Sequence, residues 1–159
     1  MDSPRGVPRD VKDRDPADMS GRTPVDVVVD YLTSVHDWEV RSSELVDAQA
    51  DDAGVIAVLD QIKAEKAAIL ERLGTLRAVA TNTTAAFGTP PSRDPAKTRV
   101  IGVEARGPHR SLVVTEESFA PETWAKHRYE YALERVAGEW RLNSRTSIDD
   151  EGKRIRGLL

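Results

Sequence analysis

Three pairs of neighbouring residues carry side chains that could do acid–base chemistry. Asp30–Tyr31 and His36–Asp37 lie close together in the first third of the chain, and Glu116–Glu117 lies further along. A carboxylate, or a histidine oriented by a carboxylate, can act as a general acid or base when it lies within hydrogen-bond reach of the proton that it moves. Adjacent residues on a helix point about 100° apart, however, so His36 and Asp37 do not pair naturally.

None of these pairs is predicted to form a catalytic site. We interpret Tyr31 as an aromatic residue at the edge of the core and Glu116–Glu117 as a solvated strand end. The histidines lack the close spacing of metal ligands: His36, His109 and His127. No phosphate-binding loop or nucleophile elbow occurs, and the absence of cysteine excludes disulfides, thiolate nucleophiles and cysteine-based zinc sites. We therefore predict no enzyme activity, no cofactor and no catalytic or metal-binding residue.

The composition is that of one domain with a real core. The chain has 159 residues, of which 39% are hydrophobic and 31% charged, and its formal net charge is −4. An acidic balance disfavours a nucleic-acid partner. No run approaches the roughly 20 apolar residues of a membrane helix, and no signal peptide is visible. We therefore expect a cytoplasmic protein that binds neither nucleic acid nor membrane.

The N-terminal half is predicted to hold a tail and two helices. Residues 1–22 are rich in proline and charge and are expected to be disordered, which leaves 23–159 as a single domain. Thr23 begins a helix that runs to about His36–Trp38 and continues beyond a bend. A second helix covers roughly Ala53–Leu73, because apolar residues recur there at helical spacing among strong helix formers.

The rest of the chain is predicted to consist mainly of strands. Leu76–Asn82 is interpreted as a short strand, and a proline-rich loop follows it. Thr98–Arg106 and Arg110–Glu117 form the next two strands, and Lys126–Leu159 forms an antiparallel meander of three. Helices followed by a run of strands predict an α+β domain, with N-terminal helices packed on one face of a curved antiparallel sheet.

The meander is predicted to have one apolar and one charged face. Apolar residues alternate with charged ones along its first two strands: Tyr129, Tyr131, Leu133, Trp140 and Leu142. Ala137–Gly138 supplies the tight turn between these strands, and we expect Trp140 to lie in the core. The candidate partner-binding surface is the charged face, on which five residues are selected: Arg128, Glu130, Glu134, Arg141 and Arg145.

The last third of the chain resembles the end of NTF2-fold immunity proteins from bacterial polymorphic toxin systems. The resemblance is carried by a strand, a glycine-containing turn, a Trp-Arg-Leu strand, a second turn and a basic-apolar end: Tyr129, Tyr131, Leu133, Gly138, Trp140, Arg141, Leu142, Gly152, Lys153, Gly157 and Leu158. It implies an NTF2-like cone, in which a curved sheet wraps around helices. It also implies a small cytoplasmic protein that binds a cognate toxin and neutralises it by occlusion.

Two alternatives remain open. The same strand pair recurs in enzymes of the NTF2-like superfamily, in which an acidic residue or a His–Asp pair lies in the cone. An enzyme or ligand-binding protein of the SnoaL or ketosteroid-isomerase type would need a pocket of about 300 Å³ or more that holds an acid with a perturbed pKa. A homodimer paired through sheet faces is the other alternative. The acidic balance would favour a basic toxin, such as a nuclease domain.

Overall fold

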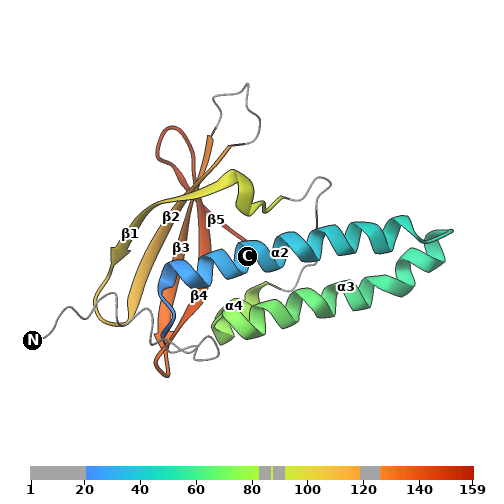
Figure 1. Cartoon of the computed structure of the whole chain (residues 1–159), viewed down its shortest axis with the longest axis horizontal. Helices are drawn as coiled ribbons and strands as arrows, with labels where there is room; N and C mark the ends of the chain where they lie inside the picture. The colour runs from blue at the N-terminus through green and yellow to red at the C-terminus, as the bar shows by residue number, and fades with distance from the viewer. Residues whose placement is uncertain (1–20, 83–86, 88–91, 119–125) are drawn as a thin grey trace, which may run out of the picture.

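The computed structural model describes residues 21–82, 87, 92–118 and 126–159. Within these ranges, three α-helices precede a five-stranded antiparallel sheet (Figure 1). The helices are α2 (Pro24–Asp47), α3 (Asp52–Leu73) and α4 (Leu76–Thr81), and the short 3-10 helix η2 covers Pro95–Lys97. The strands are β1 (Thr98–Ala105), β2 (Arg110–Ser118), β3 (Lys126–Val136), β4 (Glu139–Ile148) and β5 (Arg154–Gly157).

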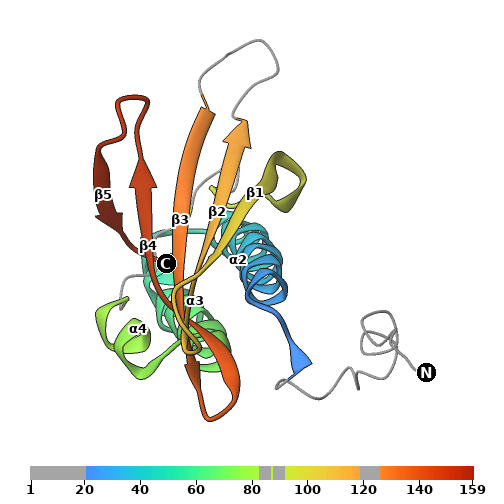
Figure 2. The same ribbon diagram turned by 90° about the vertical axis from the view of Figure 1, so that its left-hand side faces the viewer.

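This architecture confirms the predicted α+β class. The helices lie together on one side of the curved sheet (Figure 2), an arrangement consistent with a cone. The predicted disordered tail falls almost entirely on residues 1–20, which lie outside the described residues, as does the 119–125 connection between β2 and β3.

Helix α2 starts where the sequence predicts and runs further without a break. Thr23 and Asp26 form a capping box, in which each side chain accepts a hydrogen bond from the other residue's backbone N–H, at 3.1 and 2.9 Å. No bend occurs at Trp38, because this residue is fully buried and its indole N–H donates to the Ile62 carbonyl of α3 at 2.9 Å. Packing against α3 therefore carries the helix to Asp47.

Helix α4 replaces the predicted strand at Leu76–Asn82, so that prediction was wrong. The Thr75 side chain accepts a hydrogen bond from the Ala78 N–H at 3.0 Å and caps the helix. At the other end, the Asn82 side chain donates to the Ala78 carbonyl at 2.7 Å. The stretch is short and contains valine and threonine, which favour strands, but the cap and the burial of Ala78 favour the helix.

The strands follow one another in the order β1-β2-β3-β4-β5, each antiparallel to its neighbour. A two-residue turn joins β3 to β4, with Ala137 and Gly138 at φ of 52° and 83°, as a tight hairpin requires. The register shifts at Ile101 in β1 and at Asn143 in β4, which is the signature of a β-bulge. Bulges bend strands and increase their twist, and so contribute to the curvature of the sheet.

The free edge of β4 is covered by two segments. β5 pairs with Arg145–Ile148 only. Further along, Gly74 forms a parallel bridge with Leu142, and the Thr75 N–H donates to the Leu142 carbonyl at 2.8 Å. A Cβ on Gly74 would lie 2.8 Å from the Leu70 carbonyl oxygen, so the backbone conformation that ends α3 at this point favours glycine.

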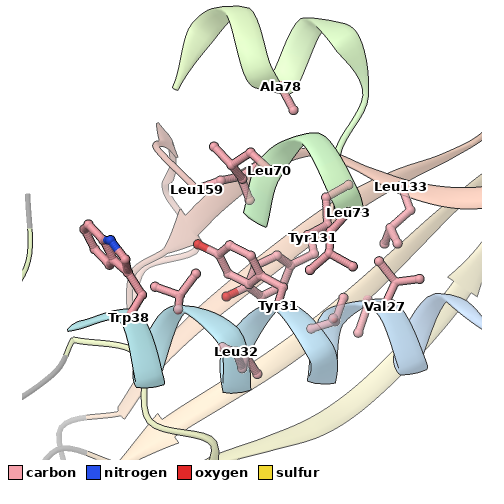
Figure 3. Close-up of a cluster of buried hydrophobic side chains, with 14 of the residues drawn as sticks. Val27, Tyr31, Leu32, Trp38, Leu70, Leu73, Ala78, Tyr131, Leu133 and Leu159 are labelled. Atoms are coloured by element: carbon pink, nitrogen blue, oxygen red, sulfur yellow. The ribbon is translucent and has the colours of Figure 1, made fainter. Parts of the chain in front are cut away.

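The hydrophobic core lies between the helices and the sheet (Figure 3). Its largest buried side chains come from α2, α3, β3 and β4: Tyr31, Leu32, Trp38, Ile62, Leu70, Leu73, Tyr131, Leu133 and Leu142. Tyr31 was expected at the edge of the core but is fully buried and packs edge-on against Tyr131, with ring centroids 5.8 Å apart. Trp140 was expected in the core but is only half-buried, because it lies opposite Arg135 near the β3–β4 turn.

Asp30 links α2 to α3 near the first turns of α2 and the last turn of α3, at the end of the helix pair away from the connecting loop. Its carboxylate accepts hydrogen bonds from Arg72 of α3 at 2.7 and 3.1 Å, from Arg22 at 2.9 Å and from Ser34 at 2.8 Å. Partial burial opposes ionisation, but these hydrogen bonds outweigh it and lower the pKa of Asp30 from 3.8 to about 2. The ionised carboxylate therefore stabilises the helix pair.

We expect Asp30→Asn to lower the free energy of unfolding at pH 7 by about 1–2 kcal/mol, after allowance for solvent screening. The folded-state pKa lies below the unfolded one, so this stability is present above about pH 4 and is lost as the pH falls towards 2. Denaturant unfolding at both pH values measures it. Asp37→Asn, at an exposed position of the same helix, is the control. An equal loss at pH 2 would show that the charge is not responsible.

Candidate functional site

The five residues of the predicted partner-binding surface do not share one face of the sheet. The alternation in β3 places Arg128, Glu130 and Glu134 on the face away from the helices, and Arg141 is paired with Glu134. Arg145 is paired with the buried Tyr131 and therefore faces the helices. The bulge at Asn143 shifts the alternation of β4, and a simple period of two cannot predict this change of face.

Three of these residues on the outer face have side-chain partners within the chain. Arg128 pairs with Glu116 at 3.4 Å, and Glu130 pairs with Arg154 at 2.6 Å. Arg141 donates to three carbonyls at the end of α3, the shortest contact being 3.1 Å to Gly74. Pairs on a sheet surface with one solvent-exposed partner, such as these arginines, stabilise a sheet by about 0–1 kcal/mol each. Their contact with a partner protein stays a prediction.

A different set of polar residues converges on the helix-facing side of the sheet. We call this set the inner cluster. It combines one residue of α2, one that precedes η2, two of β2, one of β3 and one of β4: Tyr31, Arg93, Thr115, Glu117, Tyr131 and Arg145. Figure 3 shows the rings of Tyr31 and Tyr131 side by side in the core, with both hydroxyl groups pointing towards the same side.

The alternation of β2 explains how Glu117 enters this cluster. Val113 is fully buried against the helices, so Thr115 and Glu117 face the same side, and Glu117 is only 4% exposed. Glu116 faces the outer side, where it is nevertheless buried by ion pairs with Arg99 and Arg128. The prediction that Glu116–Glu117 forms a solvated strand end was therefore wrong for both residues.

Arg93 approaches the cluster from the segment before η2. Its guanidinium donates to the Tyr31 hydroxyl at 3.3 Å and to the Leu158 carbonyl at 3.0 Å. The segment is fixed to α2 by Glu39, a buried residue whose carboxylate accepts hydrogen bonds from both the N–H and the hydroxyl of Ser92, the latter at 2.6 Å. His36 adds a contact of 3.0 Å between its Nδ1 and the Arg93 carbonyl oxygen.

Residues Leu158 and Leu159 border the other side of the cluster. Leu159 is buried, its N–H donates to the Asn82 side chain at 2.7 Å, and its carbonyl oxygen accepts from the Lys66 ammonium at 3.0 Å. Burial lowers the pKa of Lys66 to about 8, and the positive charge of Arg93 adds to the effect. The inner cluster is thus bordered by a cation that loses its proton unusually easily.

Four buried polar atoms of the inner cluster have no hydrogen-bond partner among the described residues. They are Thr115 Oγ1, Glu117 Oε2, the Tyr131 hydroxyl and Arg145 Nε. Leaving such a group unpaired costs about 1–3 kcal/mol. Burial raises the pKa of Glu117, and the nearby Arg145 and Arg93 only partly oppose it. Burial likewise raises the pKa of Tyr131. The cluster therefore offers donors and acceptors that a water or a small polar molecule would satisfy.

Sequence reasoning found part of this arrangement. It singled out Tyr31 and Glu117, which the fold brings together, whereas Asp30 binds Arg72 and Asp37 is exposed. It missed the roles of several residues: Glu39, Lys66, Arg93, Thr115 and Arg145. For some of these residues the sequence did contain a signal, namely a charged residue at a position where the helical spacing predicts a buried apolar one. Lys66, which lies among the apolar positions of α3, is an example. No pattern identifies Arg93, because it lies in an irregular segment.

Comparison of the chain with protein-family models, with curated proteins and with solved structures finds no match. Among the described residues, no three His, Asp or Glu side chains gather in a way that could hold a metal ion. In the same ranges, none of the helices is both long and apolar enough to cross a membrane.

We expect Glu117→Gln to raise the free energy of unfolding at pH 7 by about 1–2 kcal/mol, because an amide avoids the burial of an unpaired charge. The folded-state pKa of Glu117 is raised, so the unfolded state loses its proton first, and wild-type stability falls as the pH rises above about 4.5. The variant lacks this fall. Unfolding from pH 4 to 8 measures it, with Glu134→Gln as control. A destabilised variant would show that Arg145 and Arg93 hold Glu117 as a required anion.

Proposed function

We propose that this chain binds a cognate protein toxin and neutralises it by occlusion, as an immunity protein of NTF2-like fold. The proposal begins from the resemblance of the last third of the chain to NTF2-fold immunity proteins. The confirmed α+β fold supports it, since helices on a curved antiparallel sheet are what the resemblance implies. Stoichiometric binding requires no catalytic residue, only a rigid surface with a few strong contacts.

The observation that carries this proposal is that residues of the chain itself occupy space on the concave side of the sheet. Arg93 reaches between α2 and Leu158, and Leu159 packs into the core beside Lys66 and Asn82. Buried residues of the chain thus take up space that a ligand would need inside a cone. A protein arranged in this way presents its recognition groups on the outside, which favours a macromolecular partner.

The direct test is co-expression of the full chain with the toxin domain encoded beside it. We expect growth to be rescued and a one-to-one complex to form on a sizing column with light scattering. If the toxin is basic, the net charge of −4 steers the encounter. The association rate should then fall as salt shortens the Debye length to about 8 Å at 0.15 M, while dissociation changes less. Failure to bind any adjacent toxin domain would contradict the proposal.

A second candidate function is favoured by the four unpaired polar atoms of the inner cluster. A buried acid of raised pKa near Tyr131, whose ring packs against Tyr31, is the kind of site that a ligand-binding protein or enzyme of the SnoaL or ketosteroid-isomerase type uses. A small molecule that co-purifies with the chain and is released on unfolding, together with no toxin binding, would favour this second function.

A further inference from the structure

The surface around α4 differs from the rest of the described exterior. Leu76, the first residue of this helix, is 91% exposed, more than any other large hydrophobic residue described. A hollow lies on each side of the helix. Leu76 and Val79 line the first, whereas Arg77 and Thr81 line the second. We call the helix and its two hollows the α4 surface.

The first hollow is predominantly apolar. It has a volume of about 380 Å³ and lies between α4, the end of α3 and the β3–β4 hairpin. Leu76, Val79 and Val136 supply apolar groups, and the remaining lining residues are Glu71, Gly74, Thr75 and Arg141. Val136 is 43% exposed. Exposed apolar groups gathered in a concave site are typical of places that receive a side chain of a partner.

The second hollow is cationic. It has a volume of about 270 Å³ and lies between α4, β4 and β5. Arg77 and Arg156 line it together with the amide of Asn143 and the hydroxyl of Ser144, and its lining contains no carboxylate. Neither arginine forms an ion pair or side-chain hydrogen bond with any described residue, whereas eight other described arginines form ion pairs: Arg22, Arg41, Arg72, Arg99, Arg106, Arg128, Arg141 and Arg154.

Two arginines that have no ion-pair partner among the described residues are locally complementary to a carboxylate. We propose that the α4 surface docks a segment of the partner protein that carries one apolar and one acidic side chain. The apolar side chain enters the first hollow, and the carboxylate meets Arg77 and Arg156 in the second. This inference rests on the proposed function, because it names the surface through which the toxin is bound.

The width of the helix sets the spacing of the two side chains. A helix with its side chains is about 10–12 Å across, and an extended chain advances about 3.3 Å per residue. An apolar residue and an acidic residue on opposite sides of α4 are therefore separated by three or four positions. The probe is an acetylated, amidated peptide with the sequence Leu-Ser-Thr-Ser-Glu, and its control carries glutamine in place of glutamate.

Titration of the 15N-labelled full chain with these peptides tests the surface directly. We expect saturable shifts of the amide signals of residues 76–81 and 143–144, and affinity at least tenfold weaker for the glutamine peptide. Leu76→Asp combined with Arg77→Glu and Arg156→Glu should abolish the shifts. These changes are compatible with folding, since all three residues are exposed and acidic residues are favourable in the first turn of a helix.

Val103→Asp combined with Arg110→Glu is the matched control, because both residues are exposed and lie on strands away from α4. This variant should bind the peptide like the wild type. Absence of saturable shifts, equal binding of the glutamine peptide, or equal loss in the matched control would overturn the inference.

The toxin separates this inference from the proposed function. A wild-type chain that binds the toxin, alongside an α4 variant that does not, supports both. An α4 variant that still binds the toxin overturns the docking surface and leaves the proposed function standing. A wild-type chain that takes the peptide at the α4 surface but ignores the toxin retains the surface and contradicts the proposed function.

Discussion

The contact between Tyr31 and Tyr131 fixes the helix layer on the sheet and divides the space between them. On one side of these rings the filling is apolar, with Leu73, Leu133 and Leu142. On the other side, beyond the two hydroxyl groups, charged residues gather around Glu117. A tyrosine suits this boundary because its ring is apolar and its tip is polar. Apolar side chains are also buried next to charged ones, because Trp38 and Ile62 are fully buried and the Lys66 ammonium lies 5.0 Å from the Trp38 ring centroid.

Charges inside and outside the sheet are organised differently. On the outer face, glutamates and arginines alternate across strands and satisfy one another, as Glu130 and Arg154 do. Inside, Lys66, Arg93 and Arg145 outnumber Glu39 and Glu117, and Glu39 is occupied by Ser92. Lys66 is buried and the two arginines are half-buried, and such an excess of positive charge away from solvent reduces stability. A polar interior of this kind is consistent with either a ligand or trapped water.

Sequence patterns predicted the long helices and strands well, because each combined a regular spacing of apolar residues with a residue that marks its end. Thr23 marks the start of α2, Gly74 marks the end of α3, and Ala137–Gly138 marks the hairpin turn between β3 and β4. Failures arose where tertiary packing overrode a local tendency. Leu76–Thr81 became helical through a cap and a buried alanine. Arg145 changed face because of a bulge, which no alternation of residue types reveals.

The candidate site was predicted less well than the fold for a related reason. Glu117 belongs to it because the positions of β2 that face the helices are buried from Ser111 to Glu117, which depends on contacts between distant parts of the chain. Arg93 belongs to it because Glu39 and His36 of α2 hold an irregular segment. The residues of the α4 surface come from a helix, a hairpin and β5, and only the folded chain brings them together.

The way in which Gly74–Thr75 completes the β4 edge has a consequence for aggregation. An uncovered strand edge recruits strands of other molecules. β5 is only four residues long, so the backbone at Leu142 is covered only when the end of α3 docks beside it. During synthesis the helices are made first and are already available when β4 emerges. The order of elements along the chain therefore shortens the time for which this edge is exposed to intermolecular pairing.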